Sequence, residues 1–179
     1  METRKLFDGA FECQLPKDIV DASNLRQIPD NQEVFVHPLT DQSVTIDILE
    51  AVSSPNPESA ARTHFQEIAS SNEASESIID SVDVLPPPYP DENASAVVRL
   101  TGKQKVAKFN QTREDMIFIH LALYRYESDK ADVLVVINDP LKQTVNNSRN
   151  AESTSWGTST INSVLFSLRL KNRGIFGSN

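Results

Sequence analysis

The chain has 179 residues, of which 39% are hydrophobic, and it contains one cysteine, Cys13. This length suits one domain with a sizeable core, and a single cysteine excludes an internal disulfide, as in proteins of a reducing cytosol or nucleus. No run approaches the roughly 18 apolar residues that a membrane-spanning helix needs. The N-terminal stretch METRKLFDGAFECQLP has no apolar stretch typical of a secretory signal. We therefore expect a soluble globular protein that does not insert into membranes.

The net charge of −8 is unevenly distributed along the chain. Residues 1–100 carry 18 acids and 6 bases, a balance of −12, whereas residues 101–179 carry 7 acids and 11 bases, a balance of +4. Acidic surfaces repel nucleic acids and anionic membranes and attract basic proteins. The charge therefore argues against a nucleic-acid partner, and it is compatible either with a basic protein partner or with a solvated acidic surface.

The first third of the chain predicts extended structure. Residues 6–15 read as a strand or extended segment that stops at a proline, and 18–32 are rich in turn formers. Residues 33–37 and 43–50 are β-branched segments separated by a loop of hairpin length. In the second of them the apolar residues alternate, so Asp47 points away from the buried face and Glu50 falls where the strand ends.

A helix is predicted over about 57–70. Asn56 can accept a hydrogen bond as its N-cap, and Pro57 suits the first helical position. Ala61, Phe65 and Ile68 then recur at helical spacing. The helix is therefore expected to pack through a narrow apolar stripe.

The rest of the chain predicts further strands and one more helix. In chain order we expect a strand at 77–86, a proline-rich surface loop near 86–93, two short strands at 95–109 broken near Gly102, strands at 115–126 and 132–139, a polar loop at 143–159 and a helix near 159–171 that ends before Gly174. Runs of adjacent strands favour antiparallel pairing. The sequence thus predicts one α+β domain over 1–179, with a largely antiparallel sheet of about six strands flanked by helices.

Signals for catalysis are weak. His120 lies inside an apolar strand, where a hydrogen-bonded core histidine is the expected reading and a hydrolase base the alternative. His64 precedes Glu67 by three residues on the predicted helix, which indicates a surface pair. Cys13 has no basic neighbour in sequence that would lower its pKa. No zinc-ligand spacing or nucleophile elbow occurs. We expect no enzymatic activity, no cofactor and no metal.

The segment TGKQKVAK, residues 101–108, invites comparison with a phosphate-binding loop. The Walker A pattern requires a glycine where this chain has Val97, and Ser or Thr where it has Gln104. Both requirements fail, so the segment predicts a solvated basic strand, with a small basic contact site as the alternative. Its basic residues are Lys103, Lys105 and Lys108.

Several segments together resemble the Ran guanine-nucleotide release factors, the Mog family. These segments are LFDGAF (6–11), DASNLRQIPDNQEVFV (21–36), SVTIDILE (43–50), TGKQKVAK (101–108) and IFG (175–177). Their order and spacing fit across nearly the whole chain, and the match is weak over about 70–95. Asp8 stands where the family usually has a second glycine, which departs from the expected pattern at a tight turn.

The resemblance implies a fold similar to that of PsbP, with an antiparallel sheet flanked by helices. It also implies binding to the small GTPase Ran and promotion of guanine-nucleotide release, which supports nucleocytoplasmic transport and places the protein in nucleus and cytoplasm. The alternative is an adaptor or trafficking module that binds a basic segment of a membrane protein such as a sodium channel. We expect a monomer in either case.

In the family an acidic surface contacts Ran, and two motifs that belong to this surface have matches in this sequence. The DxxE element matches Asp47 and Glu50, and the PDNQEVF element includes Phe35. The resemblance therefore implies a Ran-binding set on adjoining strands and their approach loop. The predicted residues are Asp30, Asn31, Gln32, Glu33, Asp47 and Glu50.

Overall fold

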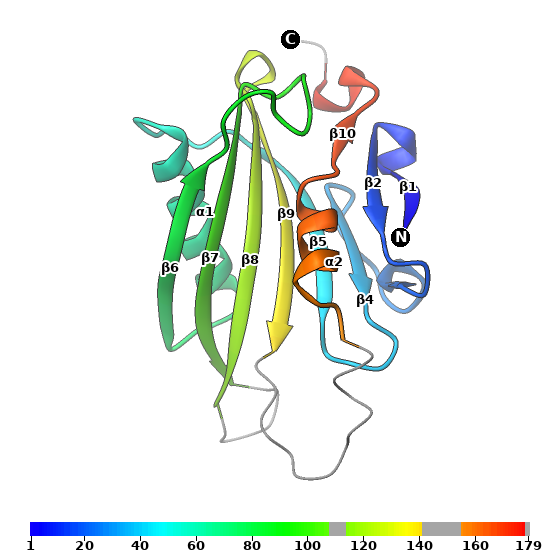
Figure 1. Cartoon of the computed structure of the whole chain (residues 1–179), viewed down its shortest axis with the longest axis vertical. Coiled ribbons are helices and arrows are strands. Elements are labelled where there is room, and N and C mark those ends of the chain that lie inside the picture. The colour runs from blue at the N-terminus through cyan, green and yellow to red at the C-terminus, as the bar shows by residue number, and fades with distance from the viewer. Residues whose placement is uncertain (108–113, 141–154, 178–179) are drawn as a thin grey trace.

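The computed structural model describes residues 1–107, 114–140 and 155–177, which form two antiparallel sheets with helices packed on them (Figure 1). The larger sheet has seven strands in the order β3-β4-β5-β9-β8-β7-β6. They are β3 (Val20–Asp21), β4 (Gln32–Val36), β5 (Ser43–Glu50), β6 (Glu76–Val84), β7 (Ala96–Ala107), β8 (Glu114–Tyr126) and β9 (Ala131–Pro140). The predicted α+β class is confirmed, and the sheet exceeds the expected six strands because the two-residue β3 pairs with β4.

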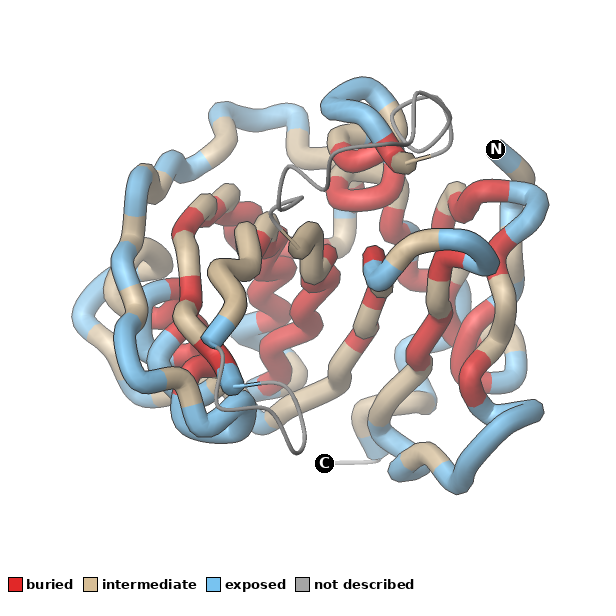
Figure 2. The backbone as a smooth tube through the Cα atoms, turned by 90° about the horizontal axis from the view of Figure 1, so that it is seen from below, coloured by how far each residue is buried: buried red, intermediate tan, exposed pale blue. Residues whose placement is uncertain are grey.

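The two faces of the larger sheet pack against different layers. One, the α2 face, lies against α2 (Thr158–Leu165) and the smaller sheet, while the other, the α1 face, lies against α1 (Pro57–Ser71). Strand residues alternate between the faces. Val44 and Ile46 are fully buried on the α2 face, whereas Leu134 and Val136 are buried beneath α1. Figure 2 shows buried segments concentrated where these layers meet.

The predicted hairpin of β4 and β5 is confirmed. The strands pair from Gln32 opposite Asp47 to Val36 opposite Ser43. On its other side, β5 pairs with β9 without interruption from Ser43 to Glu50. This double pairing fixes the face on which every side chain of β5 lies.

Helix α1 begins as the sequence predicts. The side chain of Asn56 accepts a hydrogen bond of 2.8 Å from the backbone N–H of Ser59, and Pro57 is the first helical residue. This cap satisfies one of the donors that the first turn leaves free. Ala61 and Phe65 are fully buried against the α1 face.

The break expected near Gly102 is wrong, since β7 runs through it as one strand. A Cβ atom at Gly102 would lie 2.7 Å from Cζ of Phe65 and 2.5 Å from the carbonyl oxygen of Ile78. The absence of a side chain at Gly102 therefore leaves room for the phenyl ring of Phe65 on α1. Gln104 is buried and donates to the carbonyl of Phe65, while its own carbonyl accepts from Asn72 at the end of α1. Gly102 and Gln104 of the TGKQKVAK segment thus form part of the surface on which α1 packs. Lys108 of the same segment lies outside the described residues.

The C-terminal helix is shorter than predicted. It ends at Leu165, so Gly174 does not terminate it. The chain instead forms β10 (Arg169–Leu170), which pairs with β2 (Phe11–Leu15), and β2 also pairs with β1 (Glu2–Leu6). Four short 3-10 segments complete the described part of the chain: η1 (Phe7–Gly9), η2 (Ala22–Asn24), η3 (Glu127–Asp129) and η4 (Arg173–Phe176).

The proline-rich segment is anchored immediately beyond its prolines. Residues 86–88 are exposed, but Asp91 is buried and its Oδ2 accepts hydrogen bonds from the Tyr126 hydroxyl at 2.7 Å and from the Leu170 N–H at 3.0 Å. The loop is therefore bound to the ends of β8 and β10. Most of the polar loop expected at 143–159 lies outside the described residues.

Candidate functional site

The six predicted site residues gather at one end of the larger sheet. Because β4 and β5 are antiparallel, the start of β4 and the end of β5 lie together (Figure 1). The backbone N–H of Ile48 donates to the carbonyl of Asn31 at 2.9 Å, and the Asn31 side chain donates to the carbonyl of Ile48 at 3.1 Å. Asn31 thus fastens the loop before β4 to the last residues of β5.

Gln32 and Asp47 form a pair on the α1 face. They lie directly opposite each other, and Nε2 of Gln32 donates to Oδ1 of Asp47 at 2.6 Å. The sequence predicts Asp47 on an outer face, but α1 covers this face and leaves the carboxylate half-buried. Burial raises the pKa of Asp47, while the Gln32 hydrogen bond and the nearby His64 oppose that rise.

Glu33 lies on the α2 face, away from Asp47. It stands opposite Ile46, and its Oε1 accepts a hydrogen bond of 2.8 Å from the backbone N–H of Phe7. Burial raises the pKa of Glu33, the Phe7 hydrogen bond lowers it, and the charges of Asp21 and Asp8 raise it further. Glu33 therefore connects β4 to the smaller sheet and is only partly available to a partner.

Glu50 and Asp30 are exposed at this end. The unbroken register of β5 puts Glu50 opposite Ala131, so Glu50 and Asp47, three residues apart, point to opposite faces. Asp30 borders a depression of about 320 Å³, together with residues of η1 and η4. The two halves of the DxxE element thus flank the end of β5 instead of forming a pair.

The LFDGAF segment forms the turn between β1 and β2. Phe7, Asp8 and Gly9 have φ values of 50°, 54° and 87°, all in the left-handed region. Asp8 therefore adopts the conformation for which a glycine is usual, and its exposed side chain lines the same depression as Asp30. The departure from the family pattern leaves the tight turn intact and adds a negative charge there.

Sequence reasoning missed a buried ionic cluster beneath α1. His64 was expected at the surface, but its side chain is 1% exposed: Nδ1 lies 2.9 Å from Oε2 of Glu67, and Nε2 lies 2.9 Å from Oδ2 of Asp132. Arg125 of β8 binds both oxygens of Asp132, at 2.9 and 3.0 Å, and the Val52 N–H donates to Oδ2 at 3.1 Å. Bonds to these donors outweigh burial and lower the pKa of Asp132.

The cluster lies next to the predicted site. Asp47 is opposite Leu134 and Leu49 is opposite Asp132, so the two aspartates are diagonal neighbours on the α1 face. A signal for the cluster was present in the sequence. His64 follows Ala61 by three residues and precedes Phe65, which places it in the apolar stripe of the helix.

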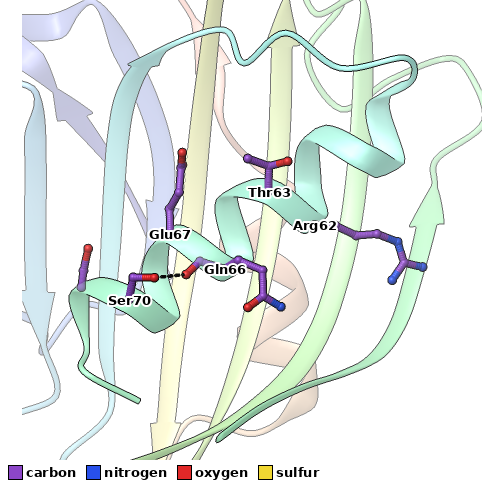
Figure 3. Close-up of a pocket in the computed structure, with 6 residues that line it drawn as sticks. Arg62, Thr63, Gln66, Glu67 and Ser70 are labelled. Atoms are coloured by element: carbon purple, nitrogen blue, oxygen red, sulfur yellow. Dashed lines mark hydrogen bonds between the residues drawn. The ribbon is translucent and has the colours of Figure 1, made fainter. Parts of the chain in front are cut away.

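The outer face of α1 bears a shallow depression of about 610 Å³. It is lined entirely by polar side chains of this helix, and Figure 3 shows Glu67 and Arg62 pointing to opposite sides of it. An open helix surface of this kind has no walls that would enclose a small ligand. The lining residues are Arg62, Thr63, Gln66, Glu67, Ser70 and Ser71.

The geometry offers little support for catalysis. Burial raises the pKa of the Cys13 thiol to about 11. His120 is partly exposed, with Nε2 4.0 Å from Oδ2 of Asp139, and burial lowers its pKa. It lines neither of the two depressions described above. Within residues 1–107, 114–140 and 155–177, no three His, Cys, Asp or Glu side chains are placed to hold a metal ion, and no helix is long and apolar enough to cross a membrane.

Known proteins resemble the chain over nearly its full length. A Danio rerio protein named Ran guanine nucleotide release factor is 38% identical, over 98% of this chain and 100% of its own. The Homo sapiens protein of the same name is 35% identical, over 96% of this chain and 95% of its own. The crystal structure of the Saccharomyces cerevisiae Ran-binding protein Mog1p superposes with a TM-score of 0.74 at 19% identity, with 98% of both chains covered, which confirms the fold.

The family comparison agrees with these relatives. Residues 4–140 match the model of the family described as Ran-interacting Mog1 protein, and this range contains every predicted site residue together with the His64 cluster. The chain belongs to the Ran-interacting Mog1 protein family.

Proposed function

We propose that this protein binds the small GTPase Ran and promotes release of its guanine nucleotide. The observation that carries the proposal is membership of the Mog1 family, with a relative 38% identical over its full length that is named a Ran guanine nucleotide release factor. The proposed contact surface is the end of the sheet where β4 begins and β5 ends. It comprises Asp30, Asn31, Gln32, Glu33, Asp47 and Glu50.

Release of nucleotide requires no bond to be made or broken by this protein. It is sufficient that the protein binds empty Ran more tightly than nucleotide-bound Ran, because linkage then weakens nucleotide binding by the same factor. A preference of about 1.4 kcal/mol weakens nucleotide binding roughly tenfold. The protein therefore acts as a regulator of Ran rather than as a catalyst with its own active-site chemistry.

The charge of the site fits a basic partner surface. Asp30 and Glu50 are exposed at this end of the sheet, and Asp47 is half-buried on the α1 face. Exposed acids accelerate encounter with a basic surface, and this steering weakens as salt screens it. A partner that contacts all three must wrap the end of β5, because Asp47 and Glu50 point to opposite faces.

The proposed cellular role follows from the same relatives. The Schizosaccharomyces pombe and Saccharomyces cerevisiae relatives are named nuclear import proteins, which supports a role in nuclear transport. We place this protein in nucleus and cytoplasm, where it acts as a monomer. A membrane-channel partner is a separate proposal that binding measurements with Ran leave open.

The test is release of a fluorescent guanine nucleotide from loaded Ran. Wild-type protein should accelerate release, and the doubly reversed variant Asp47→Lys/Glu50→Lys should lose most of that acceleration. A matched control reverses two exposed acids near the opposite edge of the sheet, Glu73→Lys/Asp83→Lys, and should release nucleotide as wild type does.

Three outcomes separate the parts of this proposal. If wild-type protein binds Ran without accelerating release, the protein is an adaptor and the release function is wrong. If the doubly reversed variant is folded and as active as wild type, the site is elsewhere. If the control variant loses the same activity, total charge and not the end of β5 governs the effect.

A further inference from the structure

The geometry of His64 determines its charge. Each ring nitrogen lies 2.9 Å from a carboxylate oxygen, Nδ1 from Glu67 and Nε2 from Asp132. An ionised carboxylate can only accept hydrogen bonds, so both nitrogens must donate, and a neutral imidazole has only one N–H. His64 is therefore an imidazolium that joins an exposed carboxylate on α1 to a buried one on β9.

The charged groups that surround His64 favour this positive charge. Asp132 comes from β9 and Asp47 from β5, while Arg125 of β8 is the other cation of the cluster. Residues 51–56, which lead from β5 into α1, contribute no ionisable side chain. Asp132 and Asp47 are like charges on neighbouring strands, and such a pair is destabilising unless a cation compensates it.

Glu67 is the outward end of this arrangement. Its side chain is 58% exposed, whereas those of His64 and Asp132 are buried. An exposed glutamate on a helix would ordinarily sample many rotamers. The bond from Nδ1 of His64 instead holds this carboxylate above the α1 face, on the side of the sheet where Asp47 lies.

We propose that His64 is a positioning residue of the Ran-binding surface, which holds Glu67 of α1 on the same face as Asp47 of β5 so that the two form one acidic surface. This inference rests on the proposed function and extends its site from the sheet end onto the helix. Glu67 would contact the partner directly, and His64 would act through Glu67 without touching the partner.

The arrangement gives Ran binding an unusual dependence on pH. Its two carboxylate partners raise the pKa of His64 despite burial, so the imidazolium persists to higher pH than that of an ordinary histidine and loses a proton as pH rises through the raised value. The remaining N–H stays with Asp132, because a buried carboxylate costs more to leave unpaired than an exposed one. Nδ1 of His64 then has no proton to donate, and the Glu67 carboxylate is no longer held in place. Binding should therefore weaken on the alkaline side, whereas a histidine that must be neutral would weaken it on the acidic side.

The experiment measures nucleotide release and Ran affinity from about pH 6 to about pH 9, which spans the usual titration range of histidine. Wild-type affinity should fall several-fold across this range. His64→Gln, which cannot carry the charge, should bind several-fold more weakly at neutral pH and respond less to pH. Glu67→Gln should behave in the same way. The control His120→Gln should keep the wild-type profile.

A second measurement addresses His64 without Ran. In nitrogen NMR spectra of the free wild-type protein, the His64 ring should be doubly protonated at neutral pH, and Glu67→Gln should lower the pH at which it titrates. A neutral His64 ring at neutral pH overturns the proposal. Because this measurement uses wild-type protein, it decides the question even if the His64→Gln variant does not fold. Folded His64→Gln with wild-type affinity and pH profile overturns it as well. If wild-type protein has no effect on Ran at any pH, the proposed function itself has failed, a result distinct from both.

Discussion

Arg125 and Asp132 lie directly opposite each other on β8 and β9, with Nε of the arginine 2.9 Å from Oδ1 of the aspartate and both side chains buried. Asp132 also accepts hydrogen bonds from His64 and from the Val52 N–H. One carboxylate thus joins two strands, α1 and the segment that precedes α1. A structural role for Asp132 can be separated from any role in binding by measuring stability alone.

We expect Asp132→Asn to lower the free energy of unfolding by about 3–5 kcal/mol, because it leaves the buried Arg125 without its counter-ion and removes the buried one of the two carboxylates that His64 faces. Urea unfolding followed by circular dichroism measures this. The matched control is Asp80→Asn, which removes the acid of a partly exposed ion pair with Lys103 at 3.2 Å and should cost less than about 1 kcal/mol. Equal losses in the two variants would contradict the assignment of Asp132 as the centre of the cluster.

Gly102→Ala should destabilise the protein by about 1–3 kcal/mol, because the new methyl group would overlap the Phe65 ring and the Ile78 carbonyl. Thermal unfolding measures the loss. Gly157→Ala is the control, since a Cβ atom there meets nothing within 4 Å. A Gly102→Ala protein as stable as wild type would show that α1 can shift away from β7 at little cost.

Asp8→Gly should leave stability unchanged or raise it by about 0.5–1 kcal/mol, because glycine adopts positive φ without the steric penalty of a side chain. Asp8→Val at the same position should lower stability by about 1–2 kcal/mol, since a β-branched residue is strained there. Chemical denaturation of both variants gives the comparison. The opposite order would contradict the left-handed turn between β1 and β2.

Cys13 should resist thiol reagents in the native protein. Its side chain is buried, Sγ contacts the Ser167 hydroxyl at 3.3 Å, and burial raises the pKa to about 11. In the unfolded chain the thiol ionises near pH 9, so between about pH 9 and about pH 11 the unfolded state loses a proton that the folded state retains. Stability should therefore fall as pH rises through that range.

Cys13→Ser or Cys13→Ala separates this contribution from other alkaline effects. The difference in unfolding free energy between wild type and Cys13→Ala should narrow above about pH 9, where ionised thiol favours the unfolded wild-type chain. Rapid labelling of the folded wild-type protein at neutral pH would contradict the buried thiol.

Local patterns in the sequence predict much of this fold. Alternation at Val44, Ile46 and Ile48 identifies β5 and its buried face, and Asn56 with Pro57 identifies the start of α1. These signals depend on neighbouring residues alone. Gly102 was misread because its function depends on Phe65, a residue 37 positions earlier in the chain, and not on the strand around it.

The resemblance predicted which residues form the candidate site, but the sequence did not predict how their side chains are arranged in space. The resemblance provided Asp47 and Glu50, whereas their separation onto two faces follows from the unbroken register of β5 with β9. His64 was expected to pair only with Glu67, because spacing within a helix cannot reveal a partner on a strand 68 residues away. Long-range pairing is the information that a single sequence does not display.

The smaller sheet has a consequence for how the chain is made. Its middle strand, β2, ends at Leu15, yet one of its partners, β10, comes from residues 169–170. During synthesis β2 therefore keeps one edge unpaired until β10 has left the ribosome. An unpaired strand edge is a template for association with other chains. A protein shortened before Arg169 should thus aggregate from its N-terminal hairpin, although the missing residues lie at the opposite terminus.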